Sequence, residues 1–259
     1  MYMKELEAAK QAAVMAGRAI MEIYESEDYG IEAKADDSPL TLADKAANRI
    51  IVDLLKEQFP NHAILSEEEM DDPVRLNTKL CFIVDPLDGT KEFIKRNGQF
   101  TVNIALADDH RSVMGVIYVP VTGELYYAAQ GHGSFMEKDG AVTELHVSKE
   151  KKSKEELNVV MSSSHGCAEM DQLLEKYDLK NFVKIGSSLK GCLIAKGEAD
   201  VYYRHTPTME WDTAAMQCIA EEAGAVFRQL DDTPMLYNRE NSLNEKGFYI
   251  INSIENKLE

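Results

Sequence analysis

The residues with the most evident chemistry lie in one short segment, Asp85-Pro86-Leu87-Asp88-Gly89-Thr90. It follows the apolar run Leu80–Val84, which predicts a buried strand and places Asp85 at or just past its C-terminal end. Two carboxylates this close repel each other unless a cation lies between them, and Mg²⁺ takes oxygen ligands of this kind. The Gly-Thr pair that follows can direct backbone N–H groups at an anion. Asp-Pro and Asp-Gly are also common turn dipeptides, so metal-assisted phosphate chemistry is favoured only together with other motifs.

The composition limits the kinds of partner. The chain has 259 residues and a net charge of −17, which argues against nucleic-acid polymers and anionic membranes as electrostatic partners. An acidic protein that handles phosphate must supply positive charge locally, and bound metal ions do so most compactly. No apolar run is long enough to span a membrane and the N-terminus carries acid early, so we expect no transmembrane helix and no signal peptide. The four cysteines are far apart in sequence, which favours free thiols in the cytoplasm.

Hydrophobic periodicity divides the chain into two parts around the charged interval Lys149–Glu156. Before this interval the pattern predicts helices over residues 6–23 and 41–59, and strands over 63–65, 80–84, 101–106, 113–118 and 125–129. After it, strands over 157–161, 182–185 and 201–203 alternate with helices over 169–177, 188–196 and 213–223. We therefore expect an α+β domain over residues 1–150 with the metal-binding motifs and an α/β domain over 151–259 with substrate-binding residues and the last metal ligand.

Other motifs are weaker when taken alone. Glu67-Glu68-Glu69 begins at a predicted strand end, although a run of acids is usually a solvated face. Asp212 opens a predicted helix, where aspartate is also a good cap. The turn Gly186-Ser187-Ser188-Leu189-Lys190 is either a simple N-cap or an anion site to which Lys190 adds charge. His165 ends a strand, where a lone histidine is more often a surface residue than a catalyst.

Taken in order, the motifs resemble one family. They are Ser38–Asp44 (Ser-Pro-Leu-Thr-x-x-Asp), Ser66–Glu68 (Ser-Glu-Glu), Asp85–Thr90, and Trp211–Ala215 (Trp-Asp-x-Ala-Ala). The combination is similar to the inositol monophosphatase-like superfamily of Mg²⁺-dependent, lithium-sensitive phosphatases and covers nearly the whole chain. The resemblance implies an α/β fold, the layered αβαβα sandwich of the inositol monophosphatase and fructose-1,6-bisphosphatase type, with the active site between its two parts.

Within this superfamily, Lys91–Gly98 resembles the bacterial CysQ branch, as do the Gly-Ser-Ser-Leu-Lys turn and the Ser-x-Ser-His strand end. That branch consists of 3′(2′),5′-bisphosphate nucleotidases, which remove the 3′-phosphate of adenosine 3′,5′-bisphosphate to leave AMP. The sulfated relative, 3′-phosphoadenylyl sulfate, is a further candidate substrate. One departure is Ser163, at a position where the branch often carries arginine, and it leaves the substrate range open.

The resemblance also implies roles for individual residues. Glu67, Asp85 and the Leu87 carbonyl would hold a first Mg²⁺ ion. Asp85, Asp88 and Asp212 would hold a second, with two or three ions in all. Thr90, paired with Asp44, would orient and deprotonate the attacking water, so the expected catalytic set is Asp44, Thr90 and Glu67. Contacts to the substrate are expected from a wider group, namely Leu87, Asp88, Gly89, Thr90, His165, Ser187, Lys190, Arg204 and Asp212.

Two alternatives stay open. An inositol monophosphatase or related sugar phosphatase would keep the metal ligands but would not need Lys190 or Arg204 for a second phosphate. A non-catalytic metal- or nucleotide-binding protein on the same scaffold could tolerate loss of Asp44 or Thr90, and both are present. We expect a small-molecule nucleotide as the partner and a cytoplasmic monomer or homodimer, with peripheral association with the inner membrane as a further option.

Overall fold

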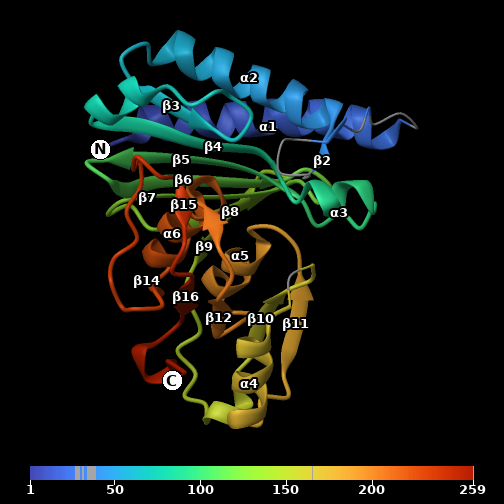
Figure 1. The fold of residues 1–259 in the computed structure, drawn as a ribbon, viewed down its shortest axis with the longest axis vertical. Helices are drawn as coiled ribbons and strands as arrows, with labels where there is room; N and C mark the ends of the chain where they lie inside the picture. The colour runs from blue at the N-terminus through green and yellow to red at the C-terminus, as the bar shows by residue number, and fades with distance from the viewer. Residues whose placement is uncertain (27–29, 31, 34–38, 165, 259) are drawn as a thin grey trace.

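Helices and sheets alternate through the molecule in five layers (Figure 1). The computed structural model describes residues 1–26, 30, 32–33, 39–164 and 166–258. Ser38, which begins the first family motif, and His165 lie outside the described residues. The expected αβαβα arrangement is confirmed, with an α+β first part and an α/β second part.

The first layer consists of helices α1 (Met3–Glu25) and α2 (Leu42–Gln58). Helix α2 begins with a capping box, because Asp44 accepts a hydrogen bond from the Thr41 backbone N–H at 2.7 Å and Ala43 N–H bonds the Thr41 hydroxyl. Buried side chains of both helices, such as Ile20 and Ile51, form one hydrophobic core with the facing side of the first sheet. This packing explains the helical periodicity that the sequence shows.

The second layer is a seven-stranded sheet in which β3 and β4 are parallel and all other neighbours are antiparallel. Its strands, in spatial order, are β3 (Ala63–Ser66), β4 (Leu80–Asp88), β5 (Thr101–Asp108), β6 (Arg111–Val119), β7 (Glu124–Ala129), β8 (Ser134–Lys138) and β9 (Ala141–Leu145). The last two were not predicted. Strand β9 is almost entirely exposed and mixes polar with apolar residues, so it carries no clear alternation that the sequence could reveal.

Strand β4 differs from its prediction in a way that shapes the site. It continues to Asp88 instead of ending before Asp85, and its pairing with β5 shifts register between these two residues. Asp85 pairs with Asn103 and Asp88 with Thr101, so β4 has one extra residue at Pro86-Leu87. Side chains three positions apart on a regular strand point to opposite faces, whereas a bulge of one residue brings them to the same face. Proline suits this bulge because it has no N–H to donate.

The third layer consists of α5 (Leu189–Ala195) and α6 (Glu210–Glu222), which lie between the two sheets. Helix α6 packs directly on β6, where Ser112 donates a hydrogen bond to the Ala214 carbonyl at 2.7 Å. Gly115 permits this approach, since a Cβ at that position would lie only 2.4 Å from the Ala215 carbonyl oxygen. The helix begins three residues earlier than predicted, because Asp212 caps it from within its first turn: its Oδ2 accepts the Met209 N–H at 2.6 Å.

The second sheet and one further helix complete the layers. The sheet has the order β11 (Phe182–Ile185), β10 (Val159–Ser162), β12 (Val201–Arg204), β16 (Phe248–Ile251) and β14 (Val226–Gln229). Its first three strands are parallel and agree with the predicted alternation. Strands β16 and β14 were not predicted, and β16 pairs antiparallel with both β12 and β14. Helix α4 (Ala168–Lys176) covers its outer face, where Met170 packs in a hydrophobic core with residues of β10, β12 and β16.

Short elements connect these layers. They are the strand pairs β1 (Glu32–Ala33) with β2 (Pro39–Leu40) and β13 (Thr208–Met209) with β15 (Leu243–Asn244), the helix α3 (Thr90–Ile94), and the 3₁₀ turns η1 (Pro73–Asn77), η2 (Lys154–Glu156) and η3 (Ile254–Asn256). Within the described residues, no helix is long and apolar enough to cross a membrane. The four cysteines are free, as predicted.

The largest hydrophobic core joins sequence from both sides of residue 150. It contains Ile83 and Ala105 from the first sheet, Ala215 from α6, and Tyr202 and Phe248 from the second sheet. Helix α6 therefore carries the last of the expected metal ligands into contact with the sheet that carries the others. The division into domains 1–150 and 151–259 stays a prediction.

Candidate active site

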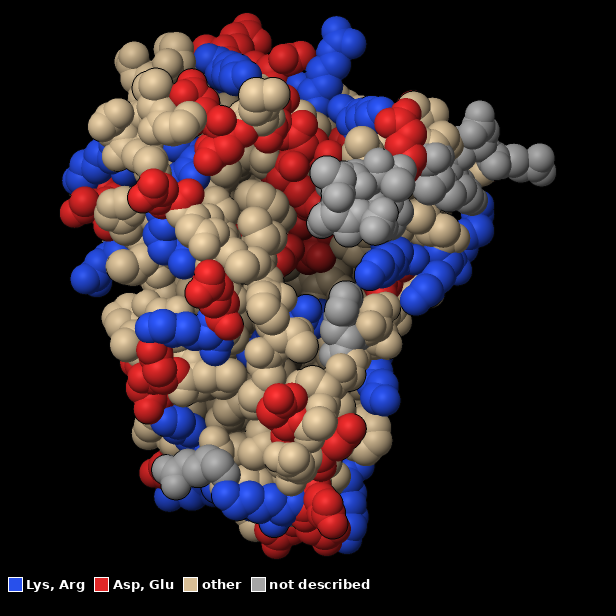
Figure 2. Space-filling model, in the orientation of Figure 1, with Lys and Arg blue, Asp and Glu red and all other residues tan. Residues whose placement is uncertain are grey.

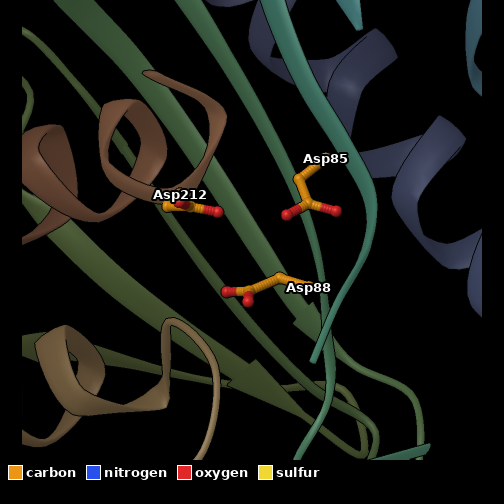
Figure 3. A group of neighbouring side chains, drawn as sticks. All are labelled: Asp85, Asp88 and Asp212. Atoms are coloured by element: carbon orange, nitrogen blue, oxygen red, sulfur yellow. The ribbon is translucent and has the colours of Figure 1, made fainter. Parts of the chain in front are cut away.

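Three carboxylates from distant parts of the sequence meet where β4 faces the start of α6 (Figure 3). One oxygen each of Asp85, Asp88 and Asp212 lies within 4.8 Å of the other two, and the three side chains point toward one another. We call this group the carboxylate cluster. The β4 bulge places the first two on one face, and the docking of α6 adds the third.

The cluster has the charge and donor atoms of a divalent-cation site. Asp85 is only 1% exposed, and burial first, followed by the charges of the surrounding carboxylates, raises its pKa well above the usual range. Burial and the neighbouring Asp88 charge likewise raise the pKa of Asp212 to about 7. Carboxylates packed this closely are destabilised when ionised, and a hard cation that takes oxygen ligands relieves that repulsion. Mg²⁺ therefore fits this set of residues.

The other two expected ligands adjoin Asp85. Glu67 follows the end of β3, where its N–H bonds the Val84 carbonyl at 3.1 Å, and its side chain is hydrogen-bonded to that of Asp85. Leu87 lies in the bulge, and its N–H donates to Asp85 Oδ1 at 3.0 Å. The structure thus brings all five expected ligands to one place, and their metal roles stay predictions.

The Thr90 hydroxyl and the Asp44 carboxylate, from two different elements, are in direct contact. Thr90 Oγ1 donates to Asp44 Oδ1 at 3.1 Å and also lies 3.3 Å from the Leu87 carbonyl oxygen. Asp44 is 1% exposed, and its other oxygen, Oδ2, accepts from the Thr41 hydroxyl at 2.6 Å. Gly89, which precedes Thr90, has φ +95°, a left-handed conformation that other residues rarely adopt.

A cavity of about 200 Å³ lies over the cluster. Figure 2 shows acidic side chains running into a hollow on this face of an otherwise mixed surface. Most of the expected substrate contacts line the cavity, which we call the candidate pocket: Asp88, Gly89, Thr90, Ser187, Lys190, Arg204 and Asp212, together with Glu67. Strand ends, the α3 start and the α5 turn thus converge on one cavity between the two sheets.

Comparison with known proteins identifies the family to which this chain belongs. The model of the inositol monophosphatase family matches residues 2–255. The chain belongs to the inositol monophosphatase family. The resemblance inferred from the motifs is therefore confirmed over almost the whole sequence.

Several members of the family are close in sequence and structure. The 3′(2′),5′-bisphosphate nucleotidase CysQ of Escherichia coli K12 is 42% identical over 95% of this chain and 98% of its own length. The crystal structure of CysQ from Bacteroides thetaiotaomicron is 40% identical, with a TM-score of 0.83 over 97% of this chain and 98% of that chain. The Thermotoga maritima IMPase shares the fold at 24% identity, with a TM-score of 0.81 over 96% of this chain and 92% of that chain.

Lys190 was expected to add positive charge to an anion site, but it is largely buried in the structure. It is 6% exposed, and its ammonium group donates to the carbonyls of Ile185 and Ser187 in the turn before α5. Burial, reinforced by the nearby Arg204 charge and opposed by Asp88, lowers its pKa to about 8. Lys190 therefore holds the turn together as well as lining the candidate pocket, and its contact with substrate stays a prediction.

The remaining expected contacts within the described residues, Arg204 and Ser187, are partly buried. Arg204 ends β12, and its Nε donates to the Thr206 carbonyl at 3.2 Å while the side chain lines the pocket. Ser187 has φ +48°, and its hydroxyl oxygen is buried without a hydrogen-bond partner among the described residues. Ser163, where the CysQ branch often has arginine, donates instead to Glu92 Oε1 at 3.3 Å.

Sequence reasoning assigned no role to Glu92 or Asn103, and it named Ser188 only as part of the turn before α5. Glu92, 5% exposed, lines the pocket and accepts hydrogen bonds from Ser163 and Ser164. Asn103 and Ser188 both donate to Asp88. The available signal was the asparagine within the apolar strand β5, because a polar side chain on a buried strand needs a partner.

Proposed function

We propose that this protein is a Mg²⁺-dependent 3′(2′),5′-bisphosphate nucleotidase, which hydrolyses the 3′-phosphate of adenosine 3′,5′-bisphosphate to give AMP and phosphate. The observation that carries the proposal is one pocket that combines the carboxylate cluster with the cationic side chains of Lys190 and Arg204. Nucleotidases named CysQ, 42% identical over almost their full length, support the choice of substrate. 3′-Phosphoadenylyl sulfate is the second substrate we propose.

The metal ligands follow from the family resemblance and the cluster. Glu67, Asp85 and the Leu87 carbonyl would hold one Mg²⁺ ion and the carboxylate cluster another, with Asp85 contributing to both, and we propose two or three ions in all. Such ions would supply a water molecule of lowered pKa and would offset negative charge on the leaving oxygen. Before metal binds, the chain keeps these ligands together at the electrostatic cost that the raised pKa of Asp85 reflects.

Thr90 and Asp44 form the proton acceptor. Since Thr90 Oγ1 already donates its proton to Asp44 Oδ1, its lone pairs are free to accept a hydrogen bond from the attacking water. As the water loses its proton to Thr90, the proton of Thr90 passes to Asp44. The two donors from Thr41 keep the Asp44 carboxylate in place for this transfer.

We expect Thr90→Val, which removes the hydroxyl and keeps the shape, to lower kcat by about 10²–10⁴-fold, the usual contribution of general acid–base catalysis. The affinity for Mg²⁺ should change little, because Thr90 is not a metal ligand in this proposal. Steady-state kinetics with a Mg²⁺ titration measure both. Thr90→Ser, which retains the hydroxyl, serves as the control and should keep most of the activity. A Val variant with near wild-type kcat would exclude this role.

Substrate binding involves both halves of the candidate pocket. The Gly89 and Thr90 amides at the start of α3 would receive the scissile phosphate, and Ser187, Lys190 and Arg204, which line the same pocket, would contact the nucleoside and its 5′-phosphate. His165 belongs to the same proposed group, although it lies outside the described residues. We propose a cytoplasmic monomer or homodimer, which agrees with four free cysteines.

The choice of cation gives a direct test of metal dependence. EDTA is expected to stop phosphate release, and Mg²⁺ to restore it. Ca²⁺ prefers longer bonds and more ligands than Mg²⁺, so it should bind the cluster without supporting turnover and should inhibit when added in excess. Lithium inhibition is expected from the family resemblance. Phosphate release measured against each cation tests these outcomes, and full activity with Ca²⁺ alone would contradict the proposed site.

A further inference from the structure

The Asp88 carboxylate is held by two uncharged donors from different parts of the chain. Asn103 Nδ2 on β5 donates to Asp88 Oδ2 at 3.1 Å, and Ser188 Oγ, at the start of α5, donates to the same oxygen at 2.7 Å. Both hydrogen bonds fall on one oxygen of the carboxylate. Among the described residues the other oxygen, Oδ1, accepts no hydrogen bond, so its lone pairs are left for a cation.

A buried chain of hydrogen bonds fixes the direction of both donors. Thr101 Oγ1 donates to Asn103 Oδ1 at 2.9 Å, which turns the Asn103 amide nitrogen toward Asp88. Ser188 Oγ accepts from that same nitrogen at 2.9 Å, so its single proton is directed to Asp88, which lies closer than the Asp212 carbonyl oxygen at 3.2 Å. Thr101, Asn103 and Ser188 are 0%, 1% and 2% exposed.

These hydrogen bonds oppose the electrostatic repulsion between Asp88 and the other carboxylates of the cluster. Like charges favour rotation of Asp88 away from its neighbours, and only a hydrogen bond or packing contact can hold it. A lysine or arginine would hold it too, but would neutralise the charge that attracts the cation. A hydroxyl and an amide orient the carboxylate and leave its charge intact.

We propose that Asn103 and Ser188 are positioning residues that preset Asp88 for metal binding, an inference that rests on the proposed function of the site. Because Ser188 lies in the turn that Lys190 braces through the Ser187 carbonyl, the same contact also ties the pocket wall to the metal site.

The test is metal affinity in the absence of substrate. Mn²⁺ binding to metal-free full-length enzyme is measured by isothermal titration calorimetry and, independently, by electron paramagnetic resonance of free Mn²⁺. Loss of an outer partner of a metal ligand typically lowers affinity by about 10–100-fold. Ser188→Ala and Asn103→Leu are each expected to fall in that range. The Mg²⁺ concentration for half-maximal turnover should rise by a similar factor, while kcat at saturating Mg²⁺ changes less.

Two variants separate positioning from packing. Ser134→Ala on β8 removes another fully buried serine hydroxyl, one without a hydrogen-bond partner among the described residues, and should leave Mn²⁺ affinity unchanged. Ser188→Thr keeps the donor and should retain affinity within about threefold of wild type, well short of the loss of a partner. Wild-type affinity in Ser188→Ala, or an equal loss in Ser188→Ala and Ser188→Thr, would overturn the proposal. Absence of nucleotidase activity in the wild type would refute the proposed function. The Mn²⁺ affinities of the variants would still test the positioning role, because they are measured without substrate.

Discussion

Asp85→Asn is expected to abolish turnover while making the metal-free protein more stable than the wild type. Asp85 is assigned to both metal ions, and loss of such an electrostatic group typically lowers the rate by about 10²-fold or more. The stability gain has a separate cause. The pKa of Asp85 is raised in the folded protein, so ionisation destabilises the fold, and the neutral asparagine removes that penalty.

The pH dependence of this gain has a defined sign. A carboxyl with a raised folded pKa stabilises the fold while protonated, and this contribution is lost as the pH rises above about 4, where unfolded aspartates ionise. The gain from Asp85→Asn should therefore be small near pH 4 and largest near pH 8. One pKa unit corresponds to about 1.4 kcal/mol, and 1 kcal/mol shifts the Tm of a chain this size by about 2–4 °C.

Thermal melts in EDTA at several pH values, with activity measured in saturating Mg²⁺, test both expectations. Asp139→Asn, at the exposed turn between β8 and β9, is the matched control and should change neither quantity. Retention of more than about a tenth of wild-type activity in Asp85→Asn, against a typical loss of about 10²-fold, would exclude the bridging role. A lower apo Tm at pH 8 would contradict the electrostatic argument.

The second large effect is expected in substrate choice. Adenosine 3′,5′-bisphosphate and inositol 1-phosphate present a similar scissile group, but only the nucleotide adds a second phosphate and a base. A charge-assisted contact to phosphate contributes about 1.5–3 kcal/mol, or roughly 10–150-fold. With Lys190 and Arg204 both facing the pocket, we expect a preference of about 10³-fold in kcat/KM for the nucleotide, by the same estimate.

Arg204→Ala is the variant that isolates this preference. It should lower kcat/KM for the nucleotide by roughly 10–150-fold and leave inositol 1-phosphate nearly unchanged. Lys190 is less suitable, because its removal also releases the turn that carries Ser188. Arg49→Ala, on the outer surface of α2 with a side chain 85% exposed, controls for a general change of charge. Equal turnover of both substrates by the wild type, or equal damage to both by Arg204→Ala, would favour an inositol or sugar phosphatase.

Some features of the site follow directly from local sequence, and others do not. The helices, the central strands and the order of the motifs have periodic or punctuated patterns that a single segment can carry. The bulge at Pro86-Leu87 could not be predicted in the same way, because it is defined by pairing with β5. The contact between Thr90 and Asp44, which joins the starts of two helices remote in sequence, has no local signature either, and it was expected only from the family resemblance.

For polar residues, too, the residue type is evident from the sequence, whereas burial and hydrogen-bond partners depend on the tertiary structure. Lys190 was expected to add charge to an anion site, because its sequence position shows its charge but not its burial or the two carbonyl groups that its ammonium contacts. The partnership of Asn103 with Ser188 depends on how α5 is placed against β5, a tertiary relation without a local signature. Strand β9 was missed because most of its residues are exposed, so the alternation that marks a half-buried strand is absent.

The close contact between Gly115 and Ala215 has a consequence for the phenotype of mutations that lie far from the site. Two members of the carboxylate cluster lie on the sheet and the third on the helix that this glycine admits, so the spacing between helix and sheet sets the width of the metal site. If the cluster binds Mg²⁺ as proposed, a substitution that widens this interface should weaken Mg²⁺ binding, even when it lies deep in the protein and touches no ligand. Such alleles would be conditional, silent in cells rich in magnesium and defective in cells starved of it.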